Sequence, residues 1–153
     1  MKKYYVVAIV AGIISARWLG FQSFSFVIPL LALLGVHYPK EDKSVWVGLL
    51  SSEVILGISA ISILTLPLFY LIYKCSSLTK RTTVYTLFSI LAYNLITNSV
   101  YAIFFMDGKI MEALVTGTPF LMKQLVSGMI FYAICQFLGK KYLYPATPVS
   151  EKA

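Results

Sequence analysis

One stretch constrains the fold of this chain more than any other. Residues 45–73 form a run of 29 positions in which Glu53 is the one formally charged side chain. A run this apolar predicts helices that lie in a bilayer. An ionised side chain at that depth costs at least about 2.5 kcal/mol, so it normally faces the interior of a helix bundle or a water-filled cavity. The surroundings of Glu53 are therefore central to any function.

Composition supports a membrane location. Charged residues make up 12% of the chain, against about 25% in soluble domains, and the mean hydropathy is +0.81. The net charge of +7 would suggest a nucleic-acid partner in a soluble protein. Here the basic residues lie in short connections between apolar runs, so we read them as topology signals and expect no nucleic-acid partner. We expect one domain, residues 1–139, followed by a cytoplasmic tail, residues 140–153.

Charge decides how the long run is divided. Taken as one helix, it gives five spans and places Lys74 on the opposite side of the membrane from Lys2. Split near residues 59–62, it gives six spans and places ten of the thirteen basic residues on the cytoplasmic side. These ten are Lys2, Lys3, Lys40, Lys43, Lys74, Lys80, Arg81, Lys140, Lys141 and Lys152.

We therefore predict an all-α membrane protein, a six-helix transmembrane bundle of the bacterial inner membrane with both termini cytoplasmic. The expected helices are residues 4–19, 24–38, 45–59, 62–75, 84–105 and 118–138. The second apolar segment is too short for a full span of about 30 Å unless it tilts or extends. Residues 1–16 also have the basic and apolar parts of a signal peptide, although a retained first helix is the better interpretation.

With this topology, several polar side chains share the outer half of the bilayer. They are Arg17, Glu53, Asn94, Asn98, Lys123 and Gln124. A few convergent polar groups in an apolar wall are typical of a binding cavity for a small polar solute. Three structural alternatives stay open. Glu53 and Lys123 could form an internal ion pair, the asparagines could hydrogen-bond between helices, and Arg17 could extend to the membrane surface.

Other features predict structural roles or exclude chemistry. Phe69, Tyr70 and Tyr73 are expected to be interfacial anchors. Cys75 and Cys135 form no CxxC motif, so we expect two inert thiols, with no metal and no cofactor. The sequence lacks an HExxH motif, a P-loop and a GxGxxG motif, so we expect no enzyme.

Several short motifs resemble a family of small bacterial membrane proteins known only as a domain of unknown function. They are Arg17-Trp18-Leu19-Gly20, the apolar run 24–34, Ser52-Glu53-Val54-Ile55-Leu56-Gly57, Thr97-Asn98 and Pro119-Phe120. Glu53 stands where that family has aspartate, and its first-loop motif is only loosely matched by Ser23-Phe24-Ser25-Phe26. The family is similar to the substrate-binding S components of energy-coupling-factor (ECF) importers, six-helix proteins that capture a vitamin or a metal ion from outside.

This resemblance implies a substrate-binding subunit with a small-molecule solute, a transmembrane coupling subunit and ATPases as its partners. It also implies that small residues of the first helix dock on the coupling subunit. The candidates are Ala8, Gly12 and Ala16, or Ala11 and Ser15. The alternative is a non-transporting scaffold of the same shape, such as the rod-shape-determining MreD proteins, which binds membrane partners and no solute.

Overall fold

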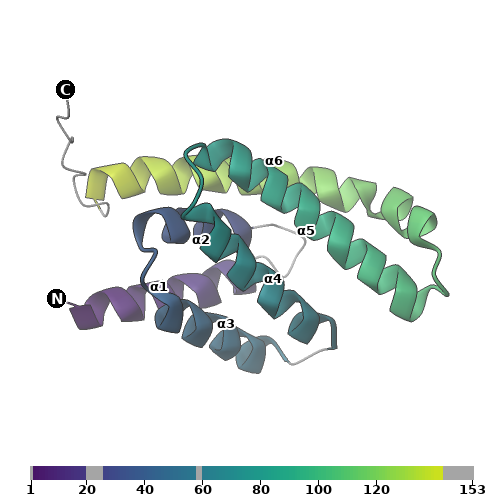
Figure 1. The fold of residues 1–153 in the computed structure, drawn as a ribbon, viewed down its shortest axis with the longest axis horizontal. Helices are drawn as coiled ribbons and strands as arrows, with labels where there is room; N and C mark the ends of the chain where they lie inside the picture. The colour runs from purple at the N-terminus through teal and green to yellow at the C-terminus, as the bar shows by residue number, and fades with distance from the viewer. Residues whose placement is uncertain (1, 20–25, 58–59, 143–153) are drawn as a thin grey trace.

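The computed structural model describes residues 2–19, 26–57 and 60–142, and within these ranges the chain forms helices joined by short connections, with no strand (Figure 1). The all-helical fold and the number of helices agree with the prediction. The bounds are α1 (Lys2–Leu19), α2 (Val27–His37), α3 (Asp42–Leu56), α4 (Ala60–Ser76), α5 (Thr82–Phe105) and α6 (Ile110–Tyr142).

The helices pack mainly in three pairs, α1 with α3, α2 with α4, and α5 with α6. Helix α2 also contacts α1, α5 and α6, so it lies at the centre of the bundle. Figure 1 shows that α1 begins and α6 ends at the same end of the bundle. Eight of the eleven residues of α2 are buried. Because α2 is enclosed by other helices, its short length is compatible with a stable position in the fold.

Close approaches at two glycines fix two of these pairs, α2 with α4 and α1 with α3. A Cβ atom added to Gly35 on α2 would overlap the Ser76 side chain and the Tyr73 carbonyl on α4. A Cβ atom added to Gly48 on α3 would lie 2.9 Å from Cδ1 of Ile13 on α1. Small residues that let helix backbones approach closely are typical of helix packing in membranes.

The long apolar run is divided, as the charge pattern indicated. Helix α3 ends at Gly57, whose φ of 90° lies in a region that residues with a Cβ atom rarely adopt. Helix α4 follows and contains Pro67.

The start of α6 differs from the prediction. The helix begins at Ile110, after a turn in which Asp107 and Gly108 have positive φ angles, and it continues through Pro119. The sequence predicted that this helix begins at residue 118. Contacts with α5 extend the helix instead, because Ala113 is buried and Gly117 lies against Asn98.

Among the described residues, two helices are long and apolar enough to cross a membrane, α5 and residues 110–141 of α6. At 1.5 Å per residue, the 24 residues of α5 measure about 36 Å, which exceeds the apolar thickness of a bilayer. In the most apolar 18-residue stretch of each helix, only 22% of the residues of α5 and 11% of those of α6 are buried inside the protein. The core helix of a soluble protein would be mostly buried, so these exposed apolar surfaces favour contact with lipid.

Candidate functional site

The strongest polar site in the described chain joins α1 to α3. The Arg17 guanidinium forms an ion pair with the Glu53 carboxylate, and their side chains are 12% and 5% exposed. Nη1 of Arg17 also donates a hydrogen bond to Oγ of Ser52 at 2.9 Å. Ser52 in turn donates to the Leu49 carbonyl at 2.6 Å. Both charges therefore lie inside the bundle, close to the last turns of α1 and α3.

Helical periodicity explains why Glu53 is buried. The buried residues of α3 recur every three or four positions: Ser44, Val45, Gly48, Leu49, Ser52 and Glu53. On α1, Ile13 and Arg17 are four residues apart and share the face that packs on α3. Ile13 meets Gly48, and Arg17 meets Ser52 one turn later. The apolar packing of α1 on α3 thus places the charged pair.

Aromatic side chains from α4 and α5 form the wall beside Arg17. The guanidinium carbon of Arg17 lies 5.3 Å from the centroid of the Phe69 ring. Phe69 stacks on Tyr93, with ring centroids 5.0 Å apart and an interplanar angle of 15°. The Tyr93 hydroxyl forms a hydrogen bond with the Thr65 side chain. Residues of α1, α3, α4 and α5 therefore meet at one buried site.

The carboxylate of Glu53 retains hydrogen-bonding capacity. Both of its oxygens are buried. Oε1 contacts Arg17, and the described residues donate no further hydrogen bond to either oxygen. An ionised carboxylate offers about four acceptor positions, so the charge contact with Arg17 does not saturate it. A polar solute that donates hydrogen bonds would match this group.

A second polar contact joins α5 to α6. Nδ2 of Asn94 donates to Oε1 of Gln124 at 2.6 Å and to the Ile90 carbonyl at 2.9 Å. Asn94 and Asn98 line a groove of about 300 Å³ between the two helices. The other lining residues are apolar or small: Phe88, Leu91, Ala92, Leu95, Leu114, Gly117 and Leu121. We name this cavity the α5/α6 groove.

The predicted six-residue cluster is thus found as two contacts. Arg17 pairs with Glu53, Asn94 pairs with Gln124, and Asn98 lines the same groove as Asn94. Glu53 is paired with Arg17, and Lys123 lies exposed on α6. The expectation that Arg17 extends to the membrane surface is wrong, because its face of α1 packs on α3.

Sequence reasoning missed the aromatic wall. Phe69 and Tyr73 were expected at the membrane interface, but both are buried, at 4% and 0% exposure. Tyr73 donates from its hydroxyl to the Tyr38 carbonyl at 2.8 Å, which connects α4 to the end of α2. A usable signal is present in the spacing of Thr65, Phe69 and Tyr73, which places them on one face of a helix.

The small residues of α1 divide between two faces. Ala16 is buried and Gly12 lies against Leu30 of α2, so neither presents an open surface. Ala8, Ala11 and Ser15 are exposed. Only this second set remains available for contact with another protein.

No described group of three or more His, Cys, Asp or Glu side chains is placed to hold a metal ion. In the described part of the chain, neither Cys75 nor Cys135 forms a disulfide. No protein family, curated protein or solved structure is found to match the chain.

Proposed function

We propose that the chain is the substrate-binding membrane subunit of an importer, similar to ECF S components, for a small solute such as a vitamin or related micronutrient. The observation that carries this proposal is the buried Arg17–Glu53 pair, whose carboxylate contacts Arg17 and accepts no further hydrogen bond from the described residues. Buried charges inside transmembrane bundles commonly mark solute or ion pathways.

In this proposal all six helices cross the membrane with both termini cytoplasmic. The start of α1 and the end of α6 lie at the same end of the bundle (Figure 1), which supports this topology. The exposed apolar faces of α5 and α6 support it as well. Lys80 and Arg81 then lie in a cytoplasmic connection between α4 and α5. Arg17 and Glu53, near the last turns of helices that rise from that side, lie toward the outside.

The site favours a solute with three features. Glu53 requires a hydrogen-bond donor or positive group, and Arg17 requires an acceptor or negative group. The stacked rings of Phe69 and Tyr93 suit a planar or apolar body. Zwitterions, nucleoside-like compounds and vitamins share these features. A coupling subunit, joined to ATPases, would dock on the exposed Ala8, Ala11 and Ser15 face of α1.

Screening of purified protein tests this function directly. Thermal shift and native mass spectrometry against vitamins, metal ions, nucleobases and amino acids should find a bound solute. Glu53→Gln should abolish that binding. Asp42→Asn, which removes a carboxylate from the exposed Asp42–Lys74 pair at the other end of α3, is the matched control and should leave it unchanged. Absence of any bound solute would overturn the proposal.

A second function, a scaffold similar to the MreD proteins, is favoured by one feature of the same site. Arg17 and Glu53 neutralise each other and join α1 to α3, as a purely structural ion pair would. Co-purification separates the two functions. Recovery of ATPase and coupling subunits supports import, whereas recovery of cell-wall synthesis proteins with no bound solute supports the scaffold.

A further inference from the structure

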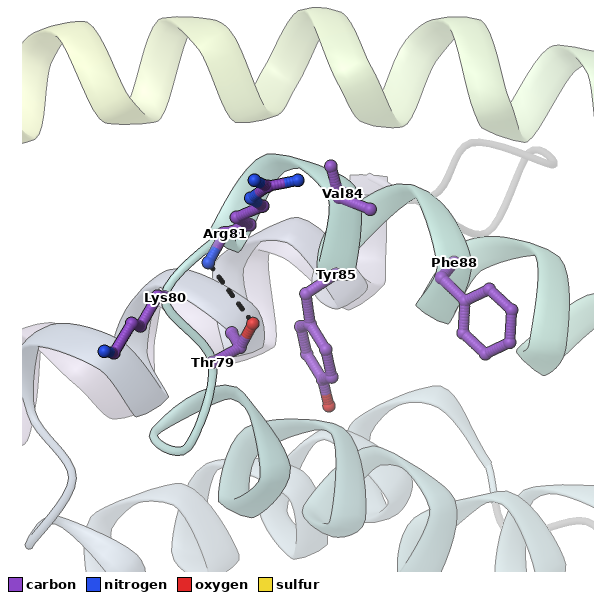
Figure 2. Close-up of a pocket in the computed structure, with 6 residues that line it drawn as sticks. All are labelled: Thr79, Lys80, Arg81, Val84, Tyr85 and Phe88. Carbon is purple, nitrogen blue, oxygen red and sulfur yellow. Dashed lines mark hydrogen bonds between the residues drawn. The ribbon is translucent and has the colours of Figure 1, made fainter.

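A second surface of the molecule lies at the connection between α4 and α5, far along α5 from the contact between Asn94 and Gln124. An open hollow of about 500 Å³ is present there (Figure 2). Its lining combines two basic residues with apolar and aromatic ones: Thr79, Lys80, Arg81, Val84, Tyr85 and Phe88. We name it the basic hollow. None of these residues belongs to the Arg17–Glu53 site.

The positive charge of the basic hollow is not neutralised by the described part of the chain. Ion pairs in the described residues join Arg17 to Glu53, Lys74 to Asp42, and Lys109 to Glu112. None of these pairs includes Lys80 or Arg81. A second hollow, of about 430 Å³, provides a contrast, because its Lys40 and Lys43 lie beside the carboxylates of Glu41 and Asp42. The basic hollow therefore has a net positive charge, whereas the second hollow is balanced.

Local contacts hold the basic hollow in shape. Oγ1 of Thr79 accepts the backbone N–H of Arg81 at 3.3 Å. The Tyr85 hydroxyl donates to the Ile72 carbonyl on α4 at 2.8 Å, and Thr83 donates to the Tyr132 hydroxyl on α6 at 3.3 Å. Figure 2 shows Tyr85 pointing to the opposite side of α5 from Arg81 and Val84. These bonds fix the start of α5 against both of its neighbours.

Exposed apolar surface continues from the basic residues along α5. Val84 and Phe88 are 59% and 68% exposed, and Phe88 lines both the basic hollow and the α5/α6 groove. Leu91, in that groove, lies ten residues after Arg81, which is about 15 Å of helix rise. This distance matches half of an apolar core about 30 Å thick. The groove therefore lies at the depth of the acyl chains in the leaflet that the basic residues face.

We propose that the basic hollow and the α5/α6 groove together bind one anionic phospholipid. Its phosphate contacts Lys80 and Arg81, and one acyl chain follows Val84 and Phe88 into the groove. Charge complementarity selects an anionic headgroup, and the apolar continuation selects a lipid over a soluble phosphate. The inference requires the chain to lie in a membrane, but it does not require solute capture.

Native mass spectrometry of the full chain, released from detergent after incubation with phosphatidylglycerol or phosphatidylcholine, tests this site. We expect one phosphatidylglycerol to be retained in preference to phosphatidylcholine. Lys80→Gln with Arg81→Gln should weaken that retention about 10- to 30-fold, since each basic residue near the surface contributes roughly three- to fivefold. Lys40→Gln with Lys43→Gln removes equal charge from the balanced hollow and should have little effect.

The acyl-chain contact is tested separately. Ala92→Leu adds volume inside the α5/α6 groove without changing charge, and it should weaken retention of phosphatidylglycerol severalfold. Inorganic phosphate at millimolar concentration should not displace the lipid. Equal retention of the two lipids by the unmodified protein would overturn the inference. So would an equal loss in the two double variants, or displacement by inorganic phosphate.

A measurement without variants guards against misfolding. Phosphatidylglycerol should raise the thermal unfolding temperature of the unmodified chain more than phosphatidylcholine does, and an equal effect would contradict the site. Lipid retention is measured on the unmodified chain without added solute. Failure of solute binding and failure of lipid binding are therefore separate outcomes.

Discussion

Arg17 of α1 and Glu53 of α3 form an ion pair inside the bundle, one helical turn beyond the contact between Ile13 and Gly48. The tight apolar contact brings the two helices together, and the charged pair follows in the same register. Removing two charges from water costs several kcal/mol for each ion, which their mutual attraction offsets only while both are present. The pair therefore makes the alignment of α1 with α3 specific.

Removing one partner of this pair should destabilise the fold more than removing both. Arg17→Gln and Glu53→Gln should each lower the free energy of unfolding by about 3–5 kcal/mol, because each leaves an unpaired buried charge. The double variant should lose less than either single variant, because it leaves no unpaired buried charge. Thermal or denaturant unfolding in detergent measures the three values. Additive losses would show that the two side chains do not interact in the folded protein.

Much of the fold was predictable from patterns along the chain. The apolar runs and the basic connections indicated six helices, and Gly57 lies close to the predicted break in the long run. The start of α6 was not predictable, because Thr118 and Pro119 form a typical helix beginning in isolation. Packing of Gly117 against Asn98 of α5, together with the burial of Ala113, overrides that local signal.

The candidate site was only partly predictable. A single acid in an apolar run indicates that Glu53 is buried. Its partner could not be deduced, because Arg17 and Lys123 were both available and the choice depends on which helix packs beside α3. The pairing of α1 with α3, across the intervening α2, is a tertiary contact that leaves no local signal. The aromatic wall was missed for the same reason. Phe69 lies beside Tyr70 and Tyr73 in the sequence, and such aromatic groups are typical of the membrane interface.

The crossing of α2 over α4 should tolerate no side chain at Gly35. Gly35→Ala should destabilise the protein by about 1–3 kcal/mol, because the new methyl group meets Ser76 and the Tyr73 carbonyl. Gly12→Ala is a matched control, since its Cβ atom would lie 3.7 Å from Leu30, an ordinary contact distance. Thermal unfolding of the two variants should separate them. Equal melting temperatures would contradict the close approach.

The amide contact between α5 and α6 should show energetic coupling. A double-mutant cycle of Asn94→Ala and Gln124→Ala is expected to give about 0.6–1.7 kcal/mol, the range measured for hydrogen bonds between membrane helices. A cycle that combines Asn94→Ala with Met122→Ala should be additive, because Met122 is exposed on α6, the helix that carries Gln124. A coupling near zero for the first cycle would mean that the hydrogen bond at 2.6 Å contributes nothing to stability.

The exposed pair at the start of α3 should respond to acid. Oδ1 of Asp42 contacts Nζ of Lys74 at 2.6 Å and accepts the Tyr70 hydroxyl at 3.1 Å. The hydrogen bond from Lys74 holds the pKa of Asp42 below its ordinary value, outweighing partial burial. The stabilisation is therefore complete above a pH of about 4 and is lost as the pH falls through the lowered pKa. Asp42→Asn should melt slightly below the unmodified protein at neutral pH. The two melting curves should converge in strong acid, and a difference that stays constant with pH would show that the carboxylate does not act through its charge.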